Sequence, residues 1–367
     1  MAKGKLVLLG SGETAPAMTK VHRELLSELG EVRALNLDSP YGFQLNVSQM
    51  TQKLVDYFKN SLQTKLNTAN FTNYAQTSPV SREIFRQKIK DSNYIFSGPG
   101  SPSYALAQWK PMNLEVDLFE VMERGGTVCF SSAAALTLGS FVAPIYEIYK
   151  AGSDIYWLEG LNLMIRFGLN CVIIPHFNNA EGGNYDTSAS FLGRSRLEML
   201  EMLLPGNTST LGIDEHTAVI IDADSGTLKV AGLSNAHWRQ NGEMLTIRSG
   251  ESIDLSSLQS TITTKTFKNN ESKLKNSESE IEKLVNRIPV ASDEEIQALA
   301  RLAYLATSED TRSIDSNGII TSLIELRADL RAQGNFILSD KIRDLLISSN
   351  VEITDSKENS AWKIKLS

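Results

Sequence analysis

Residues 126–136 read GTVCFSSAAAL, an apolar run that gives way to two serines and three alanines. The apolar part, 126–131, predicts a short buried strand, and residues 134–139 predict a helix after a turn of small residues. A serine on such a turn presents its hydroxyl above the edge of the sheet, where small neighbours let the backbone approach a substrate carbonyl. The first N–H groups of the helix would face a developing oxyanion. The same residues also suit a tightly packed strand–helix junction without a chemical role.

Strand and helix patterns alternate on both sides of this stretch. Residues 5–9 (KLVLL) form an apolar run before the turn 10–14, and residues 31–37 and 94–97 predict further strands. Apolar spacing predicts the helices at residues 18–29, 50–62, 81–89 and 114–124. Strands separated by helices of about ten or more residues favour parallel βαβ units with helices on both faces. We therefore expect a mostly parallel three-layer α/β fold, with its ligand site beyond the carboxyl ends of the strands.

The later part of the chain predicts more strands and then a second, smaller domain. Residues 195–203 predict a helix, a hairpin turns at 224–226, and another strand pair ends near residue 253. Residues 256–279 are dominated by Ser, Thr, Asn and Lys, which is typical of a linker. Helical patterns follow at residues 281–307 and 320–349. The predicted parts are an α/β domain at 1–255, a polar linker at 256–280 and a small helical domain at 281–367.

The composition excludes several classes of function. With 36 basic and 43 acidic residues, the chain has an acidic excess that argues against a surface built to hold a phosphate backbone. Cys129 and Cys171 stand far apart in apolar runs, so a disulfide framework is excluded. There is no His-Glu-x-x-His or Cys-x-x-Cys pattern, and the loop 10–12 lacks both the third glycine of a dinucleotide fingerprint and the Gly-Lys-Ser of a phosphate-binding loop. We expect no metal and no cofactor.

The apolar runs are all short. None approaches the roughly 18 residues of a membrane span, and the N-terminus runs straight into a strand pattern rather than into a signal peptide. We therefore expect a soluble, cytoplasmic protein with no membrane contact.

A base for the serine is available in His176, which ends the apolar strand 172–175. The carboxyl ends of strands in one parallel sheet bring distant residues within reach, so we expect His176 and a serine of the 131–132 turn to meet there. A histidine after a strand is also often structural. His216 is a competing candidate because it follows two acids in a loop, whereas His22 and His237 lie in a helix and a β-region.

Three motifs, taken in order, resemble the peptidase S51 family. They are the turn 130–135 (FSSAAA), the strand end 175–177 (PHF) and the segment 212–218 (GIDEHTA). The family includes cyanophycinase and aspartyl dipeptidase, on a flavodoxin-like fold similar to that of class I glutamine amidotransferases. Its glycine-rich loop is matched by residues 98–101 (GPGS). The resemblance covers roughly residues 4–250.

This resemblance implies a serine nucleophile and a histidine base. The family's turn is usually Gly-x-Ser-Ala-Gly-Ala, whose serine matches Ser132, and its histidine matches His176. Phe130 and Ala134 stand where the family has glycines, and each added side chain must find space at a crowded turn.

The oxyanion donors are expected on either side of the nucleophile. Pro99 has no N–H to donate, so the glycine-rich loop must use another amide. We expect the N–H groups of Gly100 and Ala133 to stabilise the oxyanion.

The third catalytic residue is expected to be Glu147. In the family an acid follows the nucleophile by fifteen to twenty residues, and Glu147 follows Ser132 by 15. Its aromatic and aliphatic neighbours suit an acid that holds an imidazole in one tautomer. Asp154 and Glu159 are alternatives, and an ordinary surface acid paired to Lys150 is another interpretation of Glu147.

The polar loop after His176 is the expected rim of a substrate pocket. Asn179 and Glu181 lie in it, and Arg194 and Arg196 follow. An arginine can grip a substrate carboxylate with two hydrogen bonds, although both arginines also suit a solvated helix surface.

Residues 320–367 resemble the C-terminal region of cysteinyl-tRNA synthetases. In that family an Arg-rich helix, an Ala-Asp-x-Ile-Arg-Asp helix and an Asp-Thr…Trp hairpin follow in the order found here at 323–331, 339–346 and 351–362. No synthetase catalytic domain or zinc-binding cysteine set precedes them, so aminoacylation is not implied. The expected core residues are Leu323, Leu326, Leu330, Ile342, Leu345 and Leu346.

The charges of this C-terminal part disfavour RNA. Residues 271–367 contain 17 acidic and 13 basic residues, so a broad surface for tRNA is not expected. We expect the charged side chains to lie outside or to pair at helical spacing, as Arg327 and Arg331 can with Asp340 or Asp344, in a scaffold or docking element.

The leading hypothesis is a serine hydrolase that cleaves a small peptide or amide. The alternative is a catalytically inactive amidotransferase-like protein that binds a ligand or partner, with tRNA association through the C-terminal part as a further variant. The substrate and the oligomeric state stay open.

Overall fold

The computed structural model describes residues 4–240 and 242–258 and part of the C-terminal segment. The chain divides into two compact units, residues 1–264 and 265–367. Most of the expected linker and the helix expected at 281–307 lie outside the described residues.

An eight-stranded sheet forms the centre of the first unit, in the strand order β14-β11-β10-β1-β5-β4-β2-β3. Strands β1, β5, β4, β2 and β3 run parallel to one another. Strands β10, β11 and β14 each pair antiparallel with their neighbours. Their bounds are β1 (Lys5–Leu9), β2 (Ala34–Leu37), β3 (Leu66–Thr68), β4 (Tyr94–Ser97), β5 (Thr127–Ser131), β10 (Thr217–Asp222), β11 (Thr227–Gly232) and β14 (Ser252–Asp254). The expected mostly parallel α/β fold is thereby confirmed.

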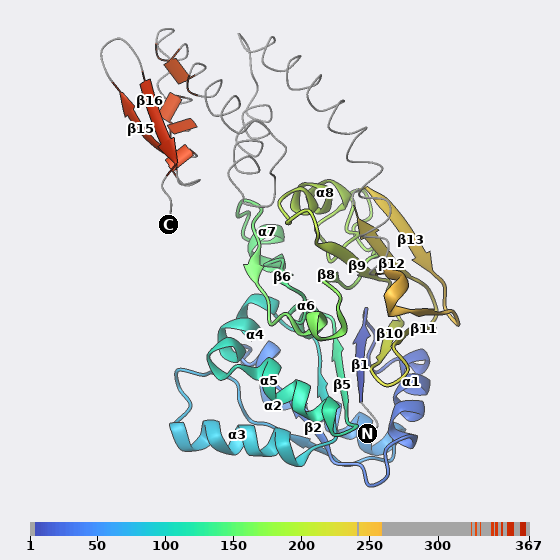
Figure 1. Cartoon of the computed structure of the whole chain (residues 1–367). Coiled ribbons are helices and arrows are strands. Elements are labelled where there is room, and N and C mark those ends of the chain that lie inside the picture. Colours follow the sequence, from blue (N-terminus) through green and yellow to red (C-terminus); the bar gives the residue numbers. More distant parts are fainter. Residues whose placement is uncertain are drawn as a thin grey trace. The chain divides into compact units, whose positions relative to one another are not determined.

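Helices cover both faces of this sheet (Figure 1). They are α1 (Pro16–Ser27), α2 (Val47–Ser61), α3 (Pro79–Asp91), α4 (Pro102–Trp109) and α5 (Leu114–Glu123). Alternation along β1 directs Val7 and Leu9 to the face shared with α1 and α2, and Leu6 and Leu8 to the face shared with α3, α4 and α5. All four side chains are fully buried, which is why the strand is apolar at each of these positions.

Two of the helices begin with the same N-terminal capping motif. Ser78 and Ser101 each cap a helix by accepting a hydrogen bond from a backbone N–H three residues on, and a proline occupies the first helical position. In α4 this cap fixes the chain directly after the loop 98–100, which lies at the carboxyl end of β4.

The strand that carries His176 lies in a second sheet, not in the large one as the sequence led us to expect. This four-stranded sheet has the order β13-β12-β9-β8, and β8 runs parallel to β9. The bounds are β8 (Cys171–Ile174), β9 (Ser209–Ile213), β12 (Ala236–Gln240) and β13 (Glu243–Ile247). The small elements β6 (Phe141–Val142), α7 (Ile145–Tyr149), β7 (Leu158–Glu159) and α8 (Arg194–Met202) complete the unit, together with the 3₁₀ turns η1 (Ser39–Tyr41), η2 (Lys110–Met112) and η3 (Leu163–Phe167).

The two sheets meet at the carboxyl end of β1 (Figure 1). There Gly10 accepts a hydrogen bond from the His176 N–H (3.1 Å) and donates its own N–H to Thr217 (2.9 Å). The Ser132 N–H donates to Leu9 (3.1 Å). The ends of β1, β5 and β8 are therefore joined by backbone hydrogen bonds, which brings Ser132 and His176 close together.

In the C-terminal unit, the described residues between 324 and 347 are helical, and β15 (Val351–Asp355) pairs with β16 (Ser360–Ile364) as an antiparallel hairpin. Ile342 and Leu346 are buried as expected, and Ile324 joins them, while the other expected core leucines lie outside the described residues. Arg327 is only 1% exposed, so it is not one of the charged side chains that lie outside.

None of the helices within the described ranges has the length and apolar character needed to cross a bilayer.

A buried histidine makes the stability of the first unit depend on pH. His22 on α1 is fully buried, with its ring nitrogens bonded to the Tyr94 hydroxyl (2.6 Å) and the Glu13 carbonyl oxygen (2.9 Å). Burial lowers the pKa of His22 from 6.5 to about 4. The unfolded chain therefore binds the His22 proton more readily than the folded chain. The contribution of the neutral His22 ring to stability is complete above pH 6.5 and declines as the pH falls to about 4.

We expect the free energy of unfolding to fall by about 3 kcal/mol over this interval. His22→Gln, which cannot titrate, should flatten the decline, and urea unfolding between pH 4 and 7 measures both curves. Parallel curves for the two proteins would contradict the assignment.

Candidate active site

Ser132 occupies a strained turn between β5 and the single-turn helix α6 (Ala133–Leu136). Its φ of 50° and ψ of −120° are unfavourable for a residue with a side chain. The turn is held on one side by its N–H bond to Leu9 and on the other by the bond from the Leu136 N–H to its carbonyl oxygen (3.2 Å). Strain that the surroundings enforce in this way is common at reactive positions, because it presents the side chain away from the backbone.

The side chains of Ser132 and His176 are in direct contact. Ser132 Oγ lies 2.9 Å from His176 Nε2, a hydrogen-bond distance suited to proton transfer. His176 also has a positive φ, 48°, directly after β8. The imidazole is 21% exposed, so it is largely shielded but still reached by solvent.

The acid that contacts His176 is Glu215, not Glu147. Glu215 Oε1 lies 2.8 Å from His176 Nδ1 and also accepts a hydrogen bond from Asn179 (3.0 Å). Burial tends to raise the pKa of Glu215, but the hydrogen bonds from Asn179 and His176 outweigh it and bring the pKa below its ordinary value. The carboxylate is therefore ionised at neutral pH and fixes the ring with the proton on Nδ1 and the lone pair of Nε2 toward Ser132.

Glu147 lies on α7 and bonds the hydroxyl of Ser103 at the start of α4. The two alternatives also lie elsewhere, since Asp154 is exposed and Glu159 is exposed and pairs with Lys110 (2.7 Å). The segment 212–218 contains the acid that contacts His176, but spacing from Ser132 directed the prediction to Glu147 on α7. The parallel pairing of β8 with β9 places Glu215 beside His176.

Phe130 and Ala134, which stand where the S51 family has glycines, do not obstruct the turn. The Phe130 ring is fully buried on the α4 side, 5.6 Å from the Trp109 ring, and Ala134 is fully buried within α6. Neither side chain stands between Ser132 and His176, which contact each other directly.

The two expected oxyanion donors lie on the loops that follow the neighbouring strands β4 and β5. Within the part of the chain that the structure describes, neither the Gly100 N–H nor the Ala133 N–H donates a hydrogen bond. Gly100 has a φ of 149°, and a Cβ there would stand 2.0 Å from the Pro40 carbonyl oxygen, so only glycine fits. The adjacent Ser101 N–H bonds that same oxygen (2.8 Å), which fixes the loop.

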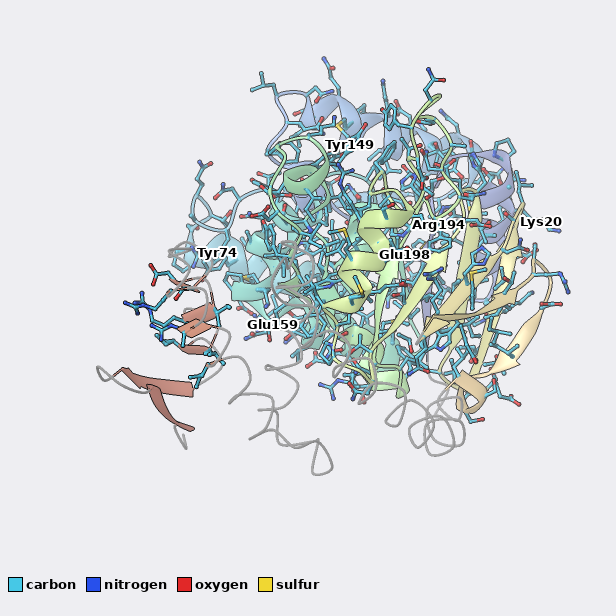
Figure 2. All side chains as sticks on the ribbon, turned by 90° about the horizontal axis from the view of Figure 1, so that it is seen from above. Lys20, Tyr74, Tyr149, Glu159, Arg194 and Glu198 are labelled. Carbon is cyan, nitrogen blue, oxygen red and sulfur yellow. The ribbon has the colours of Figure 1, made fainter. Side chains whose placement is uncertain are left out.

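Of the four residues expected to bind substrate, only Asn179 hydrogen-bonds a member of the Ser132–His176–Glu215 line. Asn179 is buried and bonds Glu215, while Glu181 is exposed. Arg194 and Arg196 are exposed on α8, the helix on which Figure 2 labels Arg194 and Glu198.

An aromatic residue that the sequence did not single out packs beside the base. The Phe191 ring lies 6.0 Å from the His176 imidazole and 5.6 Å from the Tyr149 ring. It belongs to three successive left-handed residues, 189–191, a conformation that costs roughly 1–2 kcal/mol per residue. Ser190 holds this turn by bonding the His176 carbonyl through its N–H (3.3 Å) and the Pro175 carbonyl through its hydroxyl (2.7 Å). The strained turn therefore fixes Phe191 against the imidazole.

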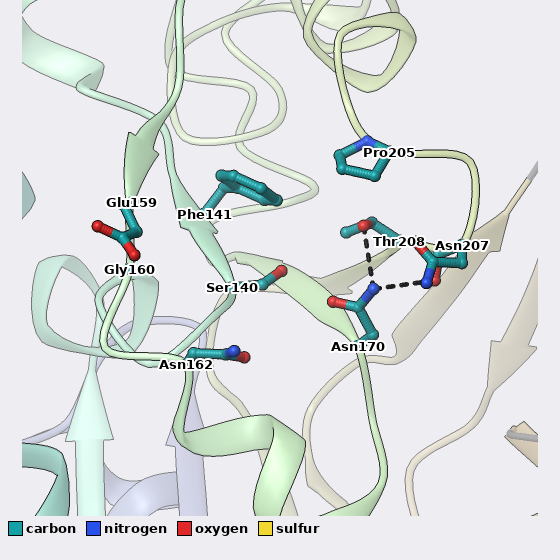
Figure 3. A pocket seen from close by; sticks show the side chains of 9 residues that line it. All are labelled: Ser140, Phe141, Glu159, Gly160, Asn162, Asn170, Pro205, Asn207 and Thr208. Atoms are coloured by element: carbon teal, nitrogen blue, oxygen red, sulfur yellow. Dashed lines mark hydrogen bonds between the residues drawn. The ribbon is translucent and has the colours of Figure 1, made fainter. Parts of the chain in front are cut away.

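A cavity of about 290 Å³ lies at the opposite end of β8 from His176 (Figure 3). Its lining is mostly polar, with Asn170 bonded to the Asn207 carbonyl and to Thr208. Ser140, on the same lining, donates its N–H to Cys171 at the first position of β8. Neither Ser132 nor His176 lines this cavity.

Comparison with known proteins supports the fold and the C-terminal resemblance. No family model matches the chain. A peptidase from an acI-B1 actinobacterium has a similar structure, with a TM-score of 0.56 and 22% identity over 69% of this chain and 97% of that one. This likeness confirms the expected peptidase-like α/β fold.

The resemblance to cysteinyl-tRNA synthetases is also confirmed, over a short stretch. Cysteine–tRNA ligase of Chlorobium chlorochromatii is 43% identical over 47 residues, and that of Chlorobaculum tepidum is 45% identical over 49 residues. Each match covers 13% of this chain. The chain spans only about a tenth of the length of these ligases.

Proposed function

We propose that this protein is a serine-type hydrolase that cleaves a small peptide or amide. The observation that carries the proposal is the continuous line of hydrogen bonds from Ser132 through His176 to Glu215. A hydroxyl, an imidazole and a carboxylate in this order are the groups that activate a serine nucleophile. The peptidase-like fold is in keeping with this chemistry, although a fold by itself does not set a function.

The reaction follows from the roles that the geometry supports. Ser132 Oγ attacks the substrate carbonyl carbon while His176 Nε2 accepts its proton, and the N–H groups of Gly100 and Ala133 stabilise the oxyanion. His176 then returns the proton to the leaving amine, which breaks the scissile C–N bond and leaves an ester on Ser132. A water molecule, deprotonated by His176, attacks that ester, and His176 returns the proton to Ser132 Oγ as the ester C–O bond breaks and the acid leaves. Glu215 stabilises the imidazolium in both steps.

The rival hypothesis was an inactive, ligand-binding amidotransferase-like protein. Its support came from Phe130 and Ala134, and both side chains pack away from the Ser132–His176 contact. For the C-terminal part we propose a scaffold or docking role rather than tRNA contact, in keeping with its acidic excess.

A fluorophosphonate probe tests the proposed nucleophile directly. These reagents phosphonylate serines that a histidine activates, so we expect one covalent adduct, located on Ser132 by peptide mass spectrometry. Ser131→Ala should still be labelled, because Ser131 bonds Glu13 and not His176. His176→Ala should not be labelled. An unmodified wild-type protein, or an adduct that persists in Ser132→Ala, would refute the proposed nucleophile.

A further inference from the structure

Glu13 places a carboxylate between the two loops that hold the proposed oxyanion donors. It lies on the loop after β1, and its Oε2 accepts a hydrogen bond from Ser131 Oγ (3.1 Å), the residue directly before the nucleophile. Its Oε1 is directed toward the β4 loop, where a Cβ on Gly98 would stand 4.0 Å from it. The carboxylate thus spans from the β5 turn to the glycine-rich loop.

The loop that carries Glu13 is firmly held. The Glu13 carbonyl oxygen accepts a hydrogen bond from His22 Nε2 (2.9 Å), so the proton of the neutral His22 ring is on Nε2. His22 Nδ1 then accepts a hydrogen bond from the Tyr94 hydroxyl. Gly12, with a φ of 65°, packs against the His216 ring so closely that a Cβ would stand 2.2 Å from it. Glu13 is therefore a positioned group rather than a loose surface acid.

Among the residues that the structure describes, Glu13 has no positively charged side chain as a partner, since neither a lysine nor an arginine there forms an ion pair with it. His22 is buried and bonds the backbone carbonyl of Glu13 rather than its carboxylate. Arg194 and Arg196 are exposed on α8 and do not pair with Glu13. The half-buried Glu13 side chain stays open to a charge supplied from outside.

A carboxylate without a positive partner, placed beside the residue two positions before each proposed oxyanion donor, disfavours a neutral substrate. The tetrahedral intermediate develops a negative charge at those donors, and like charges repel strongly where the protein lowers the dielectric constant. A cationic group on the substrate turns this repulsion into a net attraction, because it attracts the Glu13 carboxylate and screens the oxyanion from it.

We propose that Glu13 is a specificity-determining residue that receives an ammonium or guanidinium group on the acyl side of the substrate. This inference rests on the proposed hydrolase function of the same site. It assigns the substrate class as peptides or amides whose acyl residue carries a positive charge, on its side chain or on its own α-amino group.

Three anilides separate these two sources of charge. N-acetyl-lysine p-nitroanilide carries the charge on the side chain, norleucine p-nitroanilide carries it on the α-amino group, and N-acetyl-norleucine p-nitroanilide carries none. For the wild-type protein we expect kcat/KM to be at least about tenfold higher for one charged anilide than for the uncharged one. Glu13→Gln should bring that ratio close to one, by slowing the charged substrate and speeding the uncharged one. Glu24→Gln, an exposed acid on α1, should retain the wild-type ratio.

Equal rates for all three anilides, or a preference that survives in Glu13→Gln, would overturn the inference. A binding measurement keeps it separate from the hydrolase proposal. In a Ser132→Ala background, calorimetry with N-acetyl-lysine amide, norleucine amide and N-acetyl-norleucine amide should show tighter binding of a charged amide, lost on adding Glu13→Gln. If the wild-type protein hydrolyses nothing but this binding preference is present, the hydrolase proposal fails and the role of Glu13 stands. If no charged amide binds preferentially, the role of Glu13 fails whatever the activity.

Discussion

Ser132→Ala is expected to reduce kcat for any amide that the protein hydrolyses by roughly 10⁴- to 10⁶-fold. The hydroxyl is the group that His176 contacts, and no other hydroxyl among the described residues lies within hydrogen-bond distance of Nε2. The residual rate would come from the oxyanion donors and from substrate binding, which the substitution leaves in place. Steady-state kinetics on the best amide substrate measures the loss.

Two neighbouring substitutions show that the loss is chemical rather than structural. Ser131→Ala keeps the nucleophile and should retain measurable turnover. Ser132→Gly should be as inactive as Ser132→Ala but more stable by about 1 kcal/mol, because glycine adopts a φ of 50° without strain. Full activity in Ser132→Ala would exclude Ser132 as the nucleophile.

Local patterns in the sequence predict the framework that presents this serine. Apolar runs of four to five residues gave β1, β4 and β5 at their observed places, since strands buried on both faces need apolar residues throughout. Helix α4 was missed because five of its eight residues are buried, so it lacks a clear polar face. The Ser101-Pro102 start was nevertheless a recognisable helix signal.

Pairing between distant strands could not be predicted in the same way. The apolar run before His176 suits either sheet, since every residue of β8 is buried. Only the backbone bonds at Gly10 and the β8–β9 pairing reveal that a second sheet supplies the base. The position of the Glu13 carboxylate cannot be predicted from local patterns either, because its partner Ser131 is 118 positions away in the sequence.

The choice of acid is the part of the site where sequence and structure disagree, and it gives the second large prediction. Glu215→Ala should lower kcat by about 10⁴-fold, because His176 loses both its orientation and the charge that stabilises the imidazolium. Glu215→Gln should lose about as much, roughly 10⁴-fold, because a neutral amide cannot stabilise the imidazolium and can present its NH₂ group to Nδ1, which favours the wrong tautomer of His176. Asn179 can still bond the amide oxygen in the place of Oε1. An equal loss in the two variants would therefore show that the charge of Glu215, and not its shape alone, is what His176 needs.

Glu147→Gln is the matched control, since it makes the same chemical change in the acid that sequence spacing favoured. Glu147 bonds Ser103 and does not contact His176, so its amide should leave kcat within about threefold of the native value. Steady-state kinetics with one substrate at one pH compares all three variants. If Glu147→Gln abolished turnover while Glu215→Gln preserved it, the contact between Glu215 and His176 would have no catalytic role. The hydrogen bond at 2.8 Å favours the opposite result, because a carboxylate this close to Nδ1 lowers the free energy of the protonated ring that forms in the transition state.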